Sequence, residues 1–70
     1  MDRNKIKWKK IYVTNHRYLA EIVRGVLDEN GIEGVILDKK DSAYGFGEVE
    51  VYTAQENVLR AVHIIKNNNL

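Results

Sequence analysis

The chain has 70 residues, of which 44% are hydrophobic and 30% are charged, with a formal net charge of +1 and no cysteine. This length predicts a single domain with a small core, while the missing cysteines exclude disulfides and thiolate metal sites. No apolar run approaches the roughly 18 residues of a membrane span, and no apolar core follows the charged start as it would in a signal peptide. We therefore expect one cytoplasmic domain over residues 1–70, with residues 1–7 as a flexible basic arm and residues 67–70 as a frayed tail.

The charges are unevenly distributed along the chain. Residues 1–10 carry five basic side chains against one acidic one, whereas the remaining residues are acidic in balance. A basic arm can attract nucleic acid or acidic lipid. Alternating lysines can equally protect the edge of a strand from unwanted pairing, so the pattern leaves both interpretations open.

Residues 8–14, WKKIYVT, are predicted as the first strand. We expect Ile11 and Val13 to face the core, because side chains alternate between the two faces of a strand. The opposite face would then carry Trp8, Lys10 and Tyr12.

A helix is predicted after Asn15, whose side chain can cap the first turn. Its apolar stripe has the spacing of a core-facing helix and consists of Leu19, Ile22, Val23, Val26 and Leu27. Asn30-Gly31-Ile32 predicts its end, because Gly31 can adopt the left-handed conformation and Ile32 can fold back on the last turn.

The second and third strands follow on either side of a long polar loop. In residues 33–37 we expect Val35 and Leu37 inward and Ile36 on the open face. In the third strand the alternation places Val49 and Val51 inward, opposite to Glu48, Glu50 and Tyr52. The connection over residues 38–47 is longer than the two to five residues usual for a hairpin, which is typical of a functional loop. Its candidate interaction residues are Lys39, Lys40, Asp41, Ser42, Tyr44 and Phe46.

A capping box, in which Thr53 and Glu56 satisfy each other's backbone amides, predicts the start of a second helix. Its buried stripe would be Val58, Ala61, Val62 and Ile65.

The resulting order is βαββα, an α+β ferredoxin-like fold that lacks its last strand. We expect a three-stranded antiparallel sheet of order 1-3-2 with both helices on one face. The open face, which we expect to form a homo-oligomer interface, would carry Trp8, Lys10, Tyr12, Ile36, Glu48, Glu50 and Tyr52.

Several of these features together resemble a known family. The opening strand ends at Asn15, the first helix ends in Asn30-Gly31-Ile32, and a polar loop precedes the stretch GEVEVY at residues 47–52. In this the chain resembles the small bacterial domains described as "putative prokaryotic signal-transducing proteins", over about residues 8–65. The resemblance implies a cytoplasmic, ferredoxin-like domain grouped with PII-like nitrogen regulators, with a tendency to oligomerise and no catalytic residue to carry over.

The sequence offers little support for catalysis or for metal binding. His16 and His63 lack a partner at metal-ligand spacing, and Ser42 has no base nearby in the sequence. Glu48 and Glu50 would lie about 7 Å apart on one strand face, but so small a domain offers no deep cleft that would raise the pKa of either carboxyl group. We therefore expect no catalytic residue, no metal and no cofactor.

Two function classes remain, a regulatory interaction module and a single-stranded nucleic-acid-binding domain. The first would bind a protein partner or small effector through the 38–47 loop and the open sheet face. The second would use the basic arm and the sheet aromatics, since RNA-recognition domains share this topology. However, Glu48 and Val51 stand where such domains present stacking aromatics, and the two glutamates would repel phosphate. We therefore favour the interaction module, in which Phe46 is either a partner anchor or a plug over the core.

Overall fold

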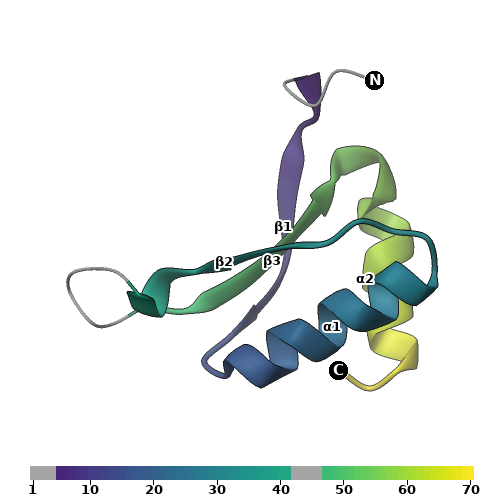
Figure 1. Cartoon of the computed structure of the whole chain (residues 1–70). Helices are drawn as coiled ribbons and strands as arrows, with labels where there is room; N and C mark the ends of the chain where they lie inside the picture. The colour runs from purple at the N-terminus through teal and green to yellow at the C-terminus, as the bar shows by residue number, and fades with distance from the viewer. Residues whose placement is uncertain (1–4, 42–46) are drawn as a thin grey trace.

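The structure of the chain is a computed structural model that describes residues 5–41 and 47–70. Within these ranges, three strands, two helices and two short 3-10 turns follow one another (Figure 1). They are β1 (Trp8–Thr14), α1 (Arg17–Glu29), β2 (Val35–Asp38), η2 (Lys39–Asp41), β3 (Val49–Ala54), η3 (Gln55–Asn57) and α2 (Val58–Asn67). The sheet has the order β1-β3-β2, and β3 is antiparallel to both neighbours. The predicted ferredoxin-like βαββα fold is confirmed.

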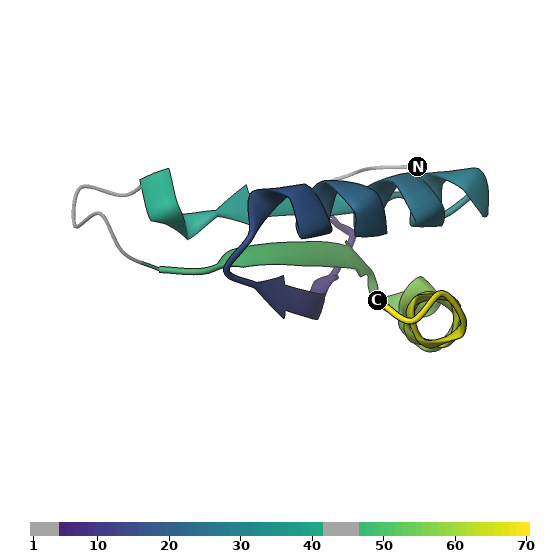
Figure 2. The same cartoon turned by 90° about the horizontal axis from the view of Figure 1, so that it is seen from below.

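The core forms where both helices meet one face of the sheet. Val49, Val51 and Thr53 alternate along β3 and are fully buried, as expected for a strand with one covered face. The helices contribute Ala20, Val23 and Leu27 from α1 and Ala61 and Ile65 from α2, and Ile32 completes the cluster. α1 lies alongside β3 and β2 in Figure 2, while α2 is seen there nearly end-on.

Ile22 was expected in this core but is 46% exposed. The buried stripe of α1 is centred on Ala20, Val23 and Leu27, and one residue along a helix turns the side chain by about 100° away from Val23. The prediction for Ile22 is therefore wrong, because the apolar residues of α1 span more of the helix surface than the sheet covers.

A β-bulge changes the faces of β1. Lys10 pairs with Tyr52, but the next partner of β3, Val51, lies opposite Tyr12, so Ile11 is the extra residue. Tyr12 consequently lies on the helix-covered side and packs against the core, together with Ile11. The prediction that Tyr12 lies on the open face is wrong, because strict alternation along the strand does not anticipate an inserted residue.

The faces of β2 are also reversed from the expectation. Ile36 lies opposite the buried Val51 and packs against the core, whereas Val35 and Leu37 lie opposite Tyr52 and Glu50. The predictions that Ile36 faces outward and that Val35 and Leu37 face inward are wrong. Three apolar residues in a row give no alternation, so the register with β3 alone decides which face each one takes.

The first helix ends as predicted but begins one residue later. Gly31 has φ of 74°, its N–H donates to the carbonyl of Asp28, and the N–H of Ile32 donates to the carbonyl of Leu27. This is the Schellman arrangement. At the other end the N-cap is His16, not Asn15, and the amide of His16 donates to Thr14 Oγ1 at 3.1 Å.

The predicted capping box does not form. Thr53 stays in β3, fully buried, and its hydroxyl donates to the carbonyl of Glu33 at 2.8 Å. That bond ties β3 to the segment before β2, and η3 separates Thr53 from α2, which begins at Val58. The prediction is wrong because the hydroxyl satisfies a buried carbonyl rather than a helix amide.

Candidate functional site

The sheet face opposite to the helices forms the candidate site. Because residues directly paired across antiparallel strands point to the same face, the partners of Glu50, Tyr52 and Ala54 share their side of the sheet. We call this surface the open face, and its members are Trp8, Lys10, Val13, Val35, Leu37, Glu50 and Tyr52. Its three aliphatic side chains are 40%, 39% and 47% exposed for Val13, Val35 and Leu37 respectively. Within the described part of the chain, an apolar surface is thus left open to solvent.

Glu50 lies at the centre of this face with its charge enclosed. Its side chain is only 5% exposed, and Lys10 Nζ and Lys39 Nζ lie 3.3 and 3.2 Å from the same carboxylate oxygen, Oε2. The Tyr52 hydroxyl donates to the other oxygen at 2.7 Å. A carboxylate removed from water is tolerated when it accepts several such hydrogen bonds. Glu50 therefore holds the side chains of two lysines and a tyrosine close together on the open face.

The titration behaviour of Glu50 and Tyr52 follows from these contacts. The hydrogen bond from Tyr52 is the main cause that lowers the pKa of Glu50 below its ordinary value. Burial opposes this effect, and Lys39 and Lys10 lower the pKa further. The same bond raises the pKa of Tyr52, with burial acting in the same direction. At neutral pH the pair is accordingly a carboxylate and a neutral phenol.

The start of the hairpin loop is fixed to both the open face and the first helix. Lys39 belongs to η2 yet reaches Glu50 across the face, and its backbone N–H donates to the carbonyl of Glu48 at 3.0 Å. Asp38 pairs with Arg17 at 3.1 Å and accepts from the amide of Lys40 at 2.9 Å. The first residues of the loop therefore continue the surface of the open face. They lie at the end of the sheet away from α2 (Figure 1).

Lys40 adds a further tie between the loop and the helix start, since its ammonium donates to the carbonyl of Asn15. Asn15 was expected to cap α1, but its backbone instead receives this side chain. Among the loop residues proposed from the sequence, Lys39 and Lys40 thus point back to the domain. Asp41 closes η2, whereas Ser42, Tyr44 and Phe46 lie outside the described residues.

Four of the residues expected on the open face are brought together there, namely Trp8, Lys10, Glu50 and Tyr52. Glu48 precedes β3 and is exposed. Sequence reasoning missed Val13, Val35 and Leu37, which it placed in the core. The only signal that marks them is indirect: Val35-Ile36-Leu37 holds more apolar side chains than one covered face of a four-residue strand can accept.

The histidines are accounted for by ordinary surface contacts. His16 lies at the start of α1 with its ring centroid 5.5 Å from that of Tyr18. His63 is on the exposed side of α2, where Nε2 lies 3.0 Å from the side-chain nitrogen Nδ2 of Asn67. Over residues 5–41 and 47–70, no group of three or more His, Cys, Asp or Glu side chains is placed to hold a metal ion.

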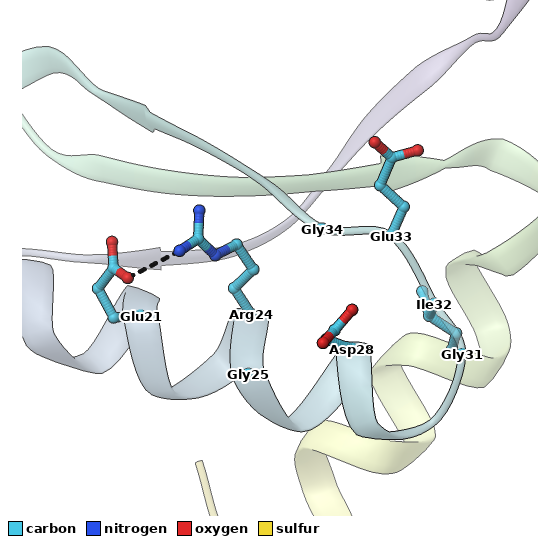
Figure 3. Close-up of a pocket in the computed structure, with 8 residues that line it drawn as sticks. All are labelled: Glu21, Arg24, Gly25, Asp28, Gly31, Ile32, Glu33 and Gly34. Atoms are coloured by element: carbon cyan, nitrogen blue, oxygen red, sulfur yellow. Dashed lines mark hydrogen bonds and ion pairs between the residues drawn. The ribbon is translucent and has the colours of Figure 1, made fainter.

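A groove of about 600 Å³ lies between α1 and the segment that leads into β2 (Figure 3). Three carboxylates and one arginine line it, together with three glycines and Ile32; they are Glu21, Arg24, Gly25, Asp28, Gly31, Ile32, Glu33 and Gly34. The guanidinium of Arg24 donates to Glu21 at 3.0 Å. A Cβ on Gly34 would meet the side chain of Arg24 at 3.3 Å, so glycine allows the close approach of helix and segment. The groove is a charged, exposed flank of α1 without the exposed aliphatic side chains of the open face.

Comparison with known families identifies the chain. The model of a family described as "Putative prokaryotic signal transducing protein" matches residues 8–69, which include every helix and strand of the fold. The chain belongs to this family. No curated protein and no solved structure matches it. In this family member, no helix within the described ranges is long and apolar enough to cross a membrane.

Proposed function

We propose that this family member is a cytoplasmic, non-enzymatic regulatory module of the PII-like kind. It binds a protein partner or a small effector through the open face and the adjoining 38–47 loop. The family's description supports a signal-transducing role, and the contact of Lys39 with Glu50 supports the start of the loop as part of the binding surface.

The observation that carries the proposal is the exposure of Val13, Val35 and Leu37 on one side of the sheet. Exposed aliphatic side chains grouped around fixed charges are typical of protein interaction sites. Lys39 links this surface to the loop, so one partner can contact both.

The state of Glu50 supports a binding role over a catalytic one. A general base needs a free lone pair near the proton that it removes, and a pKa close to the working pH. Glu50 already accepts from Tyr52, Lys10 and Lys39, and these contacts lower its pKa. Both properties make it a structural anion rather than a base.

Nucleic-acid binding is the weaker alternative. The open face offers Trp8 and Tyr52 as stacking surfaces and two lysines for phosphate. Aliphatic side chains flank them, however, and these would lie against the charged backbone of a nucleic acid.

We further propose that two copies associate through the outer edge of β1. Among the described strands, β1 and β2 each have a neighbour on one side only, and β1 is the edge beside which the last strand of a complete ferredoxin-like sheet would lie. Its unpaired backbone groups can receive a second strand, and such pairing would extend the sheet while it leaves the open face accessible.

A matched pair of leucine substitutions tests the binding role. Leu37 lies on the open face and is 47% exposed, while Leu59 lies on α2 and is 87% exposed. Because both are exposed, Leu37→Lys and Leu59→Lys should each leave the melting temperature nearly unchanged. We expect Leu37→Lys to abolish capture of specific proteins from a lysate of the source cells, as quantified by mass spectrometry, and Leu59→Lys to retain it.

Native mass spectrometry of the gently purified chain tests whether a small effector is bound, since a bound molecule adds its mass to the protein. Identical capture by the wild type and both variants, together with no retained ligand, would contradict the proposed function.

A further inference from the structure

The charge that the open face presents to a partner is positive. Lys10 and Lys39 are 47% and 50% exposed, whereas the Glu50 carboxylate between them is 5% exposed. Both ammonium groups contact the same oxygen, so they are neighbours, and each has N–H donors to spare. A partner therefore meets two adjacent ammonium groups, with their counter-ion beneath them.

Aliphatic side chains lie on both sides of this pair of lysines. Val13 on β1 and Leu37 on β2 are both paired with Glu50, so the two are separated by one strand and lie about 10 Å apart. Val35 extends the apolar surface along β2 beside Tyr52. The arrangement is an aliphatic residue, a positive centre and a second aliphatic residue.

We infer that the open face binds a protein segment in which a carboxylate side chain lies between two aliphatic side chains. This inference rests on the proposed function and names the chemistry of its partner. The carboxylate would bridge Lys10 and Lys39, while the aliphatic side chains cover Val13 and Leu37. Desolvation of the flanking apolar surface strengthens the ion pairs at the centre.

Other occupants fit less well. A second copy placed face to face would oppose two lysine pairs, which repel one another. Nucleic acid would gain stacking from Trp8 and Tyr52 but would leave three aliphatic side chains against a charged backbone. An acidic protein segment satisfies both the charge and the apolar surface.

Selection from a library of random peptides displayed on phage tests this inference directly. With the immobilised wild-type chain we expect enrichment of sequences that hold Asp or Glu between aliphatic residues. The most enriched peptide, made synthetically, should perturb the amide NMR signals of Val13, Leu37 and Tyr52.

The variants then separate binding from folding. Replacement of both Lys10 and Lys39 by Met should lower the affinity for the synthetic peptide by about tenfold. Each half-exposed ion pair contributes up to about fivefold in affinity. Replacement of both by Arg should retain binding, and Lys66→Met on α2 is the matched control. Glu50→Gln frees both lysines, so it should tighten peptide binding, a gain that loss of structure cannot produce.

Each outcome decides a different claim. Enrichment of basic or uncharged peptides, or weaker binding by Glu50→Gln, would overturn the inference while the proposed function stands. If no peptide is enriched and an oligonucleotide pool is bound instead, both the inference and the interaction module fail.

Discussion

Glu50 is only 4% exposed although it lies on the side of the sheet opposite to the helices. Val13 and Leu37 flank it on the neighbouring strands, and the two lysines and Tyr52 enclose its carboxylate. Alternation along β3 predicted that Glu50 and Tyr52 share a face. It gave no reason to expect Lys39 there, because that residue comes from η2, outside the strands.

The pH dependence of stability should reveal this enclosure. Because the folded state lowers the pKa of Glu50 from 4.5, the folded chain binds this proton less readily than the unfolded chain does. The stabilisation is therefore present above about pH 4.5 and is lost as the pH falls through the lowered value. We expect urea denaturation between about pH 7 and about pH 3 to show a smaller acid-induced loss for Glu50→Gln than for the wild type.

Glu48→Gln is the matched control, since Glu48 is exposed and precedes β3. It should follow the wild-type pH profile. Superimposable profiles for Glu50→Gln and Glu48→Gln would refute the role assigned to the enclosed carboxylate. Tyr52→Phe should move the acid loss to higher pH, because the hydrogen bond that most lowers the pKa of Glu50 is removed.

At the scale of the elements, the features encoded by neighbouring residues were predictable, and those that depend on pairing were not. The end of α1 at Gly31 was predicted because the glycine and the apolar residue after it create the cap locally. The bulge at Ile11 and the faces of β2 arise from register with β3. Thr53 was assigned to a helix cap for the same reason, since the carbonyl that it satisfies lies 20 residues away.

Substitution by alanine should have opposite effects on stability at Gly47, which precedes β3, and at Gly25, which lies within α1. Gly47 has φ of 138°, and a Cβ there would lie 3.0 Å from the carbonyl oxygen of Lys39. Gly47→Ala should therefore destabilise the chain by about 1–3 kcal/mol, because both the backbone conformation and the close contact are strained. Gly25 lies within α1 with nothing within 4 Å of its Cβ position, so Gly25→Ala should stabilise by about 0.5–1 kcal/mol.

Urea denaturation measured in parallel on both variants checks these signs. Each substitution adds the same methyl group, so a difference in stability between the two variants reflects the site and not the chemical change. A Gly47→Ala variant as stable as the wild type would show that the base of the hairpin tolerates a side chain. The entry into β3 would then not depend on its contact with Lys39.

For the whole molecule, the chain order of the elements sufficed to predict the sheet order and the helical layer. A short strand-helix-strand unit followed by a hairpin and a helix leaves few ways to bury the apolar stripes together. The open face was predicted less well, because its composition depends on the bulge and on the orientation of β2. The same topology leaves β1 at the edge of the described sheet, where a fourth strand would complete a ferredoxin-like sheet.

Cysteine cross-linking tests whether a second copy occupies that edge. The chain contains no cysteine, so single substitutions at Lys9, Ile11 and Val13 report on β1 without background. In a two-fold antiparallel pair, a residue near the axis lies opposite its own copy, where paired Cβ atoms are close enough for a disulfide. We expect oxidation to give a covalent dimer of twice the 8.1 kDa chain mass for at least one of the three positions. Lys66→Cys on α2 should stay monomeric, and sedimentation of the wild type should show a reversible dimer. A strict monomer at high micromolar concentration, with no cross-link above the Lys66→Cys level, would refute pairing through β1.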